Sequence, residues 1–214
     1  MKFTSHERHY EVDRFGVIVQ ADHRPYVYDA QYSATYDTPE YQRQSEKLQA
    51  LRLGFVHGAH GHPIRSIIDC GYGNGAFMKA AKEQIPYVYG QDVTGVMVDN
   101  CYIMPEIVKA DVLTMWDVLE HFPDISFVKD IPCETICVSL PYCHFHTEGK
   151  EWFDTVYKHR KPDEHIRHFN EYSLKAMMDS LGWKVVAVSG HEDMVRKSAH
   201  GLQNILSMAF KRKT

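Results

Sequence analysis

Asp69 and the glycines that follow it form the part of the sequence whose residue types and spacing are best suited to binding a ligand. Gly71, Gly73 and Gly75 alternate after the apolar run at residues 66–68 and precede a helical pattern. A glycine has no Cβ, so the backbone can approach a ligand closely, and the N-terminus of the following helix offers unpaired N–H groups. Asp69 adds a negative charge that a purely phosphate-binding loop would avoid. The pattern therefore predicts a nucleotide-like ligand with a cationic end.

Several histidines later in the chain could accept a proton from a substrate. They are His121, His144, His146, His165 and His168. An imidazole titrates near neutral pH, which makes histidine the natural base for an oxygen or nitrogen acceptor. We expect the loops that carry these residues to converge over one site, and His121, His144, His165 and His168 are the candidate bases. For each of them alone, the alternative is a structural or surface role.

Asp117, Glu120 and His121 are spaced so that a short helix would place all three on one face. Two carboxylates and an imidazole could bind Mg²⁺ and activate a hydroxyl group. The alternative, which we favour, is that Glu120 caps or forms an ion pair and that His121 packs. A zinc site is disfavoured because no C-x₂-C pair is present and Cys137 lies within a predicted strand. We therefore predict no metal ligands, with Mg²⁺ as the alternative.

The composition bounds the class of protein. The chain has 214 residues, a formal net charge of −4 and five cysteines. These values predict a single-domain, reduced, cytoplasmic protein and disfavour a nucleic-acid partner. We expect a monomer or homodimer. The N-terminus lacks the apolar core of a signal peptide, and no apolar run is long enough for a membrane span. We therefore expect no membrane partner.

Strands that alternate with helices must position these residues. The predicted strands are residues 66–69, 87–90, 107–108, 111–115, 135–140, 183–188 and 204–210. Helices are predicted at residues 38–58 and 76–84, and a third is predicted to start at Asn170 or Ser173 and to end at residue 181. This alternation predicts an α/β fold with a doubly wound, mostly parallel sheet, and the last two strands predict one antiparallel edge strand. Residues 1–63 are expected to form an N-terminal extension and a lid helix packed on a core at 64–214. An acceptor-binding insertion is expected at 141–170.

The motifs resemble those of class I S-adenosylmethionine-dependent methyltransferases, which have a Rossmann-like fold with seven strands. In chain order they are residues 68–75 (IDCGYGNG), 89–92 (YGQD), 114–122 (TMWDVLEHF), 138–141 (VSLP), 165–174 (HIRHFNEYSL) and 181–186 (LGWKVV). The resemblance covers roughly residues 64–210 and keeps the order of the family motifs. It implies S-adenosylmethionine as the cofactor.

The resemblance also assigns roles to individual residues. Asp69 and the turn of Gly71, Tyr72, Gly73 and Gly75 would hold the methionine moiety. Asp92 would accept hydrogen bonds from the ribose hydroxyls. Trp116 and Asp117 would border the sulfur or the adenine. Tyr32, one of the tyrosines at 26, 28, 32 and 36, would belong to a lid over the cofactor.

The acceptor is expected to be a small molecule or sugar-like compound that is methylated at oxygen or nitrogen. An aromatic and cationic acceptor pocket is predicted from Trp152, Phe153, Tyr157, Tyr172, Arg160, Lys161 and Arg167. Two other classes of function are open. The glycine pattern also satisfies G-x-G-x-x-A, which is typical of NAD(P)-dependent oxidoreductases. The short segment 93–110 leaves room for a non-catalytic scaffold with the same fold.

Overall fold

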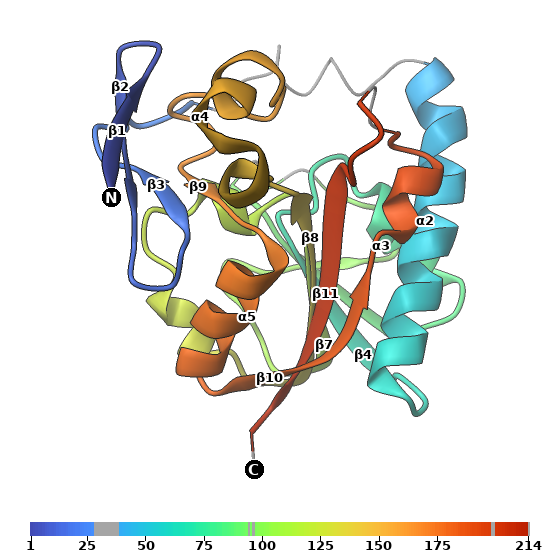
Figure 1. The fold of residues 1–214 in the computed structure, drawn as a ribbon. Coiled ribbons are helices and arrows are strands. Elements are labelled where there is room, and N and C mark those ends of the chain that lie inside the picture. Colours follow the sequence, from blue (N-terminus) through green and yellow to red (C-terminus); the bar gives the residue numbers. More distant parts are fainter. Residues whose placement is uncertain (28–38, 94, 96, 198–199, 214) are drawn as a thin grey trace.

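Seven strands form one mixed sheet at the centre of the protein (Figure 1). In this computed structural model the described residues are 1–27, 39–93, 95, 97–197 and 200–213. In sheet order the strands are β10 (Trp183–Ser189), β11 (Ile205–Arg212), β8 (Cys133–Pro141), β7 (Ala110–Trp116), β4 (Ser66–Cys70), β5 (Tyr87–Gln91) and β6 (Tyr102–Ile103).

Most of the sheet is parallel. β4 pairs in parallel with β5 and β7, and β7 pairs in parallel with β8. β11 runs antiparallel to both of its neighbours, β8 and β10. The predicted Rossmann-like, mostly parallel sheet and the antiparallel pairing of the last two strands are confirmed. The antiparallel strand, β11, was predicted at the edge of the sheet. It lies one place in from the edge, because β10 pairs with its outer side.

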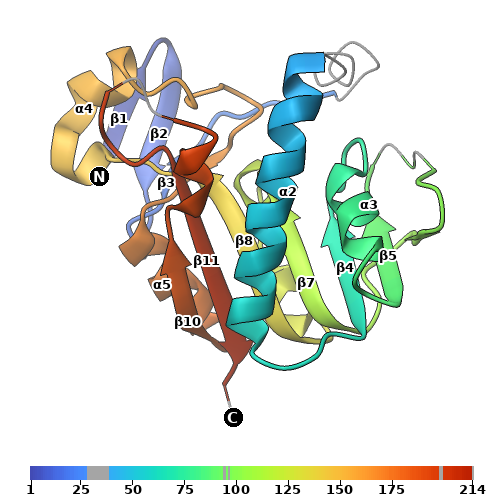
Figure 2. The same ribbon diagram turned by 90° about the vertical axis from the view of Figure 1, so that its right-hand side faces the viewer.

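Helices cover both faces of the sheet (Figure 2). α2 (Pro39–His60) and α3 (Ala76–Lys82) pack on one face, and α5 (Glu171–Ser180) packs on the other. Each layer buries its own apolar cluster, one around Val56 and Phe77 and the other around Leu174 and Trp183. Single 3₁₀ turns lie at η1 (Leu119–His121), η2 (Ser126–Asp130) and η3 (His191–Met194). Among the described helices, none has the length and apolar character of a membrane span.

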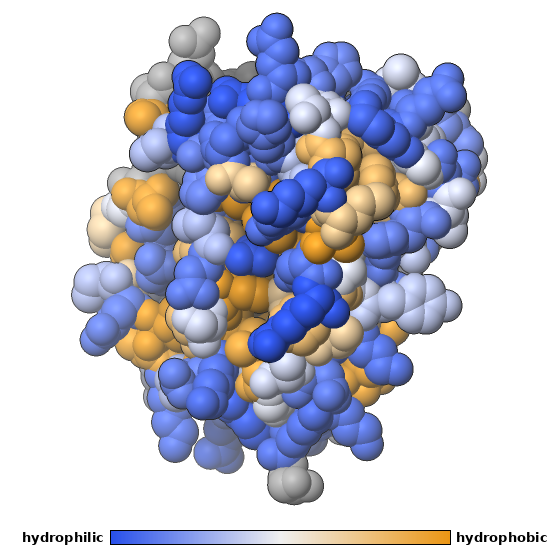
Figure 3. All heavy atoms as spheres, turned by 60° about the vertical axis from the view of Figure 1, so that its left-hand side comes forward, coloured by the Kyte–Doolittle hydropathy of each residue, from blue (hydrophilic) through white to orange (hydrophobic). Residues whose placement is uncertain are grey.

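A small antiparallel sheet joins the N-terminal segment to the insertion after β8. Its strands, in order, are β1 (Lys2–Ser5), β2 (Arg8–Val12), β3 (Ile18–Gln20) and β9 (Arg167–His168). α4 (Phe145–Thr155) covers it, and Tyr10, Phe145 and Phe153 form a third buried cluster between them. This side of the molecule is mostly hydrophilic, with scattered apolar patches (Figure 3). No firm periodicity marks residues 1–37, so these strands were not assigned from the sequence.

The ends of two helices follow local sequence signals. α2 begins at Pro39, as predicted, and Thr38 lies outside the described residues. The helix continues through Gly58, the predicted stop, and ends before Gly61, whose φ of 80° is left-handed. At the start of α5 the Asn170 side chain accepts a hydrogen bond from the Ser173 N–H at 2.8 Å, and Ser173 Oγ accepts one from the Asn170 N–H at 3.0 Å. This reciprocal cap selects Asn170 between the two predicted starts.

The third strand lies earlier than predicted. β6 pairs with β5 at Tyr102 and Ile103, whereas the sequence analysis placed a strand at Ile107 and Val108. Two residues suffice because β6 is an edge strand with one partner in the described structure. Ile107 instead lines the large cavity described below.

Candidate active site

The glycine turn after β4 adopts the conformation that its sequence predicts. Gly71, Gly73 and Gly75 have φ values of 73°, 55° and 74°, a region that L side chains rarely adopt. A Cβ on Gly71 would lie 2.4 Å from a methyl carbon of Val118, and a Cβ on Gly75 would lie 2.4 Å from one of Val98. A Cβ on Gly73 would meet no described atom within 4 Å. Packing therefore requires two of the glycines, while the third faces open space.

A cavity of about 1660 Å³ opens at the carboxyl ends of the central strands. Its walls include Asp69, Gly71, Tyr72, Gly73, Asp92, Trp116, Asp117, His121 and His165. Gly75 lies against Val98 and is absent from the described walls of the cavity, and Tyr32 lies outside the described residues. Single-ligand pockets are typically about 300–1,000 Å³. The cavity is therefore large enough for two ligands side by side.

Two carboxylates flank the glycine turn. Asp69 is buried in β4, and its Oδ1 accepts a hydrogen bond from Thr114 Oγ1 at 2.7 Å. Burial raises the pKa of Asp69 to about 7, although the Thr114 hydrogen bond and the charge of Arg52 oppose the shift. Asp92 follows β5, and its Oδ2 accepts a hydrogen bond from the Gly73 N–H at 2.9 Å. Asp92 thus holds the turn while it lines the cavity.

A network of four charges lies beside these carboxylates, in which Arg52 and Glu192 are buried and Asp117 and Arg196 are partly exposed. Arg196 donates to both oxygens of Asp117, at 2.7 and 2.8 Å, and to Glu192 at 2.8 Å. Arg52 donates to Glu192 at 2.8 and 3.1 Å and to Asp117 at 3.2 Å, and its guanidinium lies 4.8 Å from the Trp116 ring centroid. Sequence reasoning missed Arg52, Glu192 and Arg196, because charged residues in a helix or loop are usually solvated.

The network changes the interpretation of Asp117. Burial alone would raise the pKa of this carboxyl, but Arg196 and then Arg52 hold it well below its usual range. The alternative Mg²⁺ set of Asp117, Glu120 and His121 does not form among the described side chains. Asp117 faces two guanidinium groups, and both His121 ring nitrogens lie within 3.1 Å of backbone carbonyl oxygens, those of Glu164 and Asp117.

Glu120 is a buried acid near the cavity for which the described structure shows no hydrogen-bond partner. It lies in η1, and this holds for both of its carboxylate oxygens. Burial, and then the nearby charge of Asp117, raise its pKa well above the usual value. The predicted cap or ion pair of Glu120 is therefore absent among the described residues.

The structure separates the four candidate bases. His121 and His165 line the cavity, with their ring centroids 4.8 Å apart. His144 faces a second, smaller cavity and lies 2.7 Å from the Gln203 carbonyl oxygen. His168 packs among Tyr10, Phe153 and Tyr157 in the third apolar cluster, and burial lowers its pKa to about 3. Neither His144 nor His168 is among the described residues that line the large cavity.

The predicted aromatic acceptor pocket is also absent. Phe153 and Tyr157 are buried in the third apolar cluster, with Trp152 packed against it, and Tyr172 is exposed on α5. Arg167 donates to the carbonyl oxygens of Phe122 and Pro123. Of the predicted set, Lys161 alone is among the described residues that line the large cavity.

His159 is a cavity residue that the sequence analysis did not select. Its Nε2 lies 3.0 Å from Asn204 Oδ1, and the Asn204 amide donates through Nδ2 to the Arg196 carbonyl at 2.7 Å. The second contact fixes the amide so that Oδ1 can only accept from His159. Nε2 therefore carries the proton, and Nδ1 keeps its lone pair. Burial lowers the pKa of His159 to about 4, so the ring is neutral at neutral pH.

Comparison with known proteins identifies the family. A family model described as a methyltransferase domain matches residues 38–188, which is most of the chain. The chain belongs to this family. It is a methyltransferase, and the family resemblance inferred from the motifs is confirmed. No curated protein matches its sequence.

Solved structures share the fold of the methyltransferase at low sequence identity. An S-adenosylmethionine-dependent methyltransferase from Clostridium acetobutylicum is 8% identical with a TM-score of 0.59, over 86% of this chain and 98% of that one. Magnesium protoporphyrin IX methyltransferase from Synechocystis, solved with bound SAH, is 13% identical with a TM-score of 0.52, over 79% and 83%. The YcgJ protein from Bacillus subtilis is 13% identical with a TM-score of 0.57, over 79% and 99%.

Family membership decides between the classes of function left open by the sequence. The methyltransferase is an enzyme, so neither the oxidoreductase nor the non-catalytic scaffold is kept as an alternative. The short segment after β5 is compatible with the fold, because β6 completes the seven strands with only two residues.

Proposed function

We propose that the enzyme transfers a methyl group from S-adenosylmethionine to an oxygen or nitrogen of a small, sugar-like acceptor that carries a negative charge. The observation that carries this proposal is that two chemically different groups of residues line one cavity. Asp69, Asp92 and the glycine turn lie at the carboxyl ends of β4 and β5 and define its first end, and Lys158, His159, Lys161 and His165 come from the segment between α4 and β9 and define its second end. A cationic donor and an anionic acceptor would each find complementary charges there.

The residues at the first end fit S-adenosylmethionine. The open space at Gly73 leaves room for a ligand against the backbone. Asp69 would face the cationic methionine end, Asp92 would accept from the ribose hydroxyls, and Trp116 would border the sulfur or the adenine. When bound, the cofactor supplies an electrophilic methyl group. The protein then has to align the acceptor and exclude water.

Protonation of Asp69 is expected to weaken S-adenosylmethionine binding as the pH falls. The pKa of Asp69 is raised to about 7 by burial in the ligand-free protein, and a cationic ligand favours the carboxylate, so binding lowers this pKa. The Kd should therefore rise below about pH 7, by up to about tenfold per pH unit, and the contribution of Asp69 should be constant above that range. Calorimetric titrations across this range measure the effect.

Asp69→Asn is the control for this pH dependence. The amide keeps an acceptor for Thr114 but carries no titratable proton, so its Kd should be weak and nearly flat over the same pH range. An equally steep dependence in Asp69→Asn would show that another group titrates and that Asp69 does not face the cationic end.

The second end would hold and activate the acceptor. Lys158 and Lys197 line the cavity and form no ion pair with any described side chain, so they can bind a carboxylate or phosphate. His159 would take the proton from the attacking group through Nδ1, because Asn204 holds Nε2–H on the other side of the ring. His165 stacks behind His159, with ring centroids 6.4 Å apart and an angle of 8° between the rings.

A screen of acceptors tests the charge of the substrate. Phosphorylated and carboxylated sugars, nucleotides and aromatic acids are compared with their neutral analogues, and release of S-adenosylhomocysteine is measured. We expect turnover with an anionic member and a lower kcat/KM in Lys158→Met and Lys197→Met. Turnover confined to neutral compounds or to proteins would contradict the proposal.

With the acceptor in hand, His159→Gln is expected to lower kcat by about 10²–10⁴-fold. S-adenosylmethionine affinity should stay within a factor of about two, because His159 lies at the acceptor end. His146→Gln is the matched control, since His146 is exposed on α4 and bonds to the Gly16 carbonyl outside the cavity. A kcat that is equal in the two variants would remove His159 from the reaction.

A further inference from the structure

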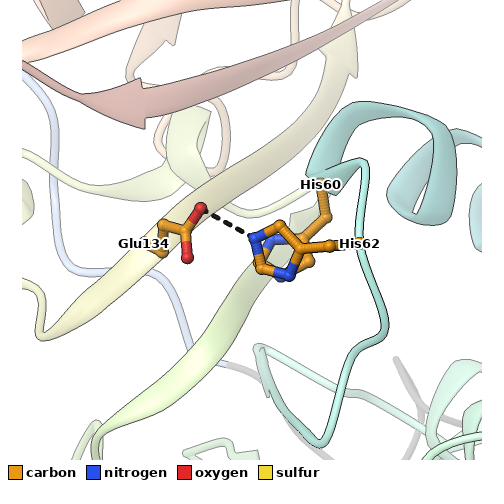
Figure 4. Close-up of side chains that lie close together, drawn as sticks. All are labelled: His60, His62 and Glu134. Carbon is orange, nitrogen blue, oxygen red and sulfur yellow. Dashed lines mark hydrogen bonds and ion pairs between the residues drawn. The ribbon is translucent and has the colours of Figure 1, made fainter.

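A second group of chemically active side chains lies at the opposite end of the sheet from the cavity. His60 ends α2, His62 follows two residues later, and Glu134 lies near the start of β8 (Figure 4). One nitrogen of each imidazole and one oxygen of the carboxylate all lie within 4.8 Å of one another. His62 Nε2 is 3.1 Å from Glu134 Oε1, and the two ring centroids are 3.8 Å apart.

His60 is prepared to offer a lone pair. Its side chain is fully buried, and its Nδ1 lies 2.8 Å from the hydroxyl oxygen of Thr135, the residue after Glu134. In the tautomer that donates from Nδ1–H to Thr135, Nε2 is unprotonated and can bind a cation. Nε2 has no hydrogen-bond partner among the described residues. A buried imidazole nitrogen without a partner is costly unless a ligand completes it. Metal-binding histidines are commonly oriented by a hydrogen bond of this kind at the other ring nitrogen.

We propose that His60, His62 and Glu134 bind a divalent transition-metal ion of the zinc class. Two imidazoles and one carboxylate form a donor set that suits this class. Tetrahedral zinc with bonds of about 2.1 Å needs ligand atoms about 3.4 Å apart, so the ligands must close by at most about 1.4 Å. His62 and Glu134 can move, since their side chains are 50% and 49% exposed. Their exposure also leaves a position for water and a path for the ion.

Three charged side chains face the buried imidazole of His60. They are Glu134, Asp111 and Lys211. Lys211 Nζ donates to the His60 carbonyl at 2.9 Å and lies 3.3 Å from Glu134 Oε1. The positive charge of this ammonium group repels a metal cation. The affinity of the site for the ion should therefore be lower than that of the same three ligands without Lys211.

The ion would link the C-terminal end of α2 to β8, because His60 and His62 lie at that end of the helix and Glu134 lies in the strand. Because this end of the sheet is remote from the large cavity, metal binding should raise thermal stability without changing affinity for S-adenosylmethionine. At a hundredfold excess of metal over Kd, the expected rise in Tm is about 5–10 °C.

The test uses the full chain after treatment with a chelator and Zn²⁺ alone as the ligand. We expect one ion per chain by calorimetry, and an electronic spectrum of the Co²⁺ form without thiolate charge transfer. His62→Gln and Glu134→Gln change exposed side chains, so they should fold normally and weaken Zn²⁺ binding by about 100-fold or more. Thr135→Val should weaken it by about 10- to 100-fold, and Lys211→Met should strengthen it several-fold.

Two controls separate this site from others in the chain. His57→Gln removes a histidine from the last turn of the same helix and should leave Zn²⁺ binding unchanged. Glu120→Gln alters a second cluster, in which Glu120, His121 and His165 also lie close together at the cavity. Unchanged binding in His62→Gln and Glu134→Gln, or loss in Glu120→Gln, would overturn the proposal, as would the absence of binding to the wild-type protein.

Discussion

Replacing Arg196 by methionine is expected to lower the free energy of unfolding by about 3–5 kcal/mol. The guanidinium binds Asp117 through two hydrogen bonds and Glu192 through a third. Its removal leaves two nearby carboxylates with Arg52 as their remaining guanidinium partner, and the Glu192 side chain has no exposed surface. An uncompensated buried charge costs more than the ion pair itself contributes, so truncation of one member is strongly destabilising. Denaturant unfolding at neutral pH measures the difference.

Lys213→Met is the matched control for this experiment. It breaks an ion pair with Asp179 in which both side chains are well exposed, so a change of at most about 1 kcal/mol is expected. If Arg196→Met were no more destabilising than Lys213→Met, the network would not be desolvated in solution. The double variant Arg196→Met/Glu192→Leu should recover part of the loss, because it removes one of the stranded carboxylates.

Local signals explain the parts of the fold that the sequence predicted. The glycines at 71, 73 and 75 adopt left-handed φ values, which almost no other residue tolerates, so their spacing indicates the turn directly. Pro39 starts a helix because its fixed φ and missing N–H suit the first position. Asn170 and Ser173 form a reciprocal cap within four residues. Each of these signals depends only on near neighbours in the chain.

Pairing between distant segments explains what the sequence did not predict. β3 pairs with β9 through Ile18 and His168, which are 150 residues apart, and no local pattern marks that contact. The insertion supplies a strand and a helix to the N-terminal sheet, so its aromatic residues are buried in a core instead of lining an acceptor pocket. Aromatic composition alone cannot distinguish these two uses.

The same limit applies to the candidate bases. His144 and His159 lie in one His-rich segment, and their residue type is identical. The difference is set by Asn204, which comes 45 residues after His159 and orients its ring at the cavity, while His144 lies against the Gln203 carbonyl. The only signal in the sequence for a base was the number of histidines near the insertion. That number indicated the region of the chain, but it could not distinguish His159 from its neighbours.

Asp92→Ala is expected to weaken S-adenosylmethionine binding by about 100-fold. The proposed role of Asp92 is to accept hydrogen bonds from the ribose hydroxyls, and a bond to a charged acceptor contributes about 1.5–3 kcal/mol. Asp92 also accepts from the Gly73 N–H at 2.9 Å, so the substitution removes a support of the glycine turn as well. Calorimetry of the wild-type protein, Asp92→Ala and Asp99→Ala measures the loss. Asp99 is exposed and is absent from the described walls of the cavity, so its substitution should leave affinity unchanged.

A cycle with a modified ligand separates the two contributions of Asp92. S-adenosylhomocysteine and its 2′-deoxy analogue are titrated into the wild-type protein and Asp92→Ala. If Asp92 binds the ribose, the missing hydroxyl should weaken binding to the wild-type protein and have much less effect in Asp92→Ala, because the pair is already broken. Equal losses in both proteins would mean that Asp92 acts through Gly73 alone. The turn would then be the whole of its contribution, and the ribose would have to be held by another side chain of the cavity.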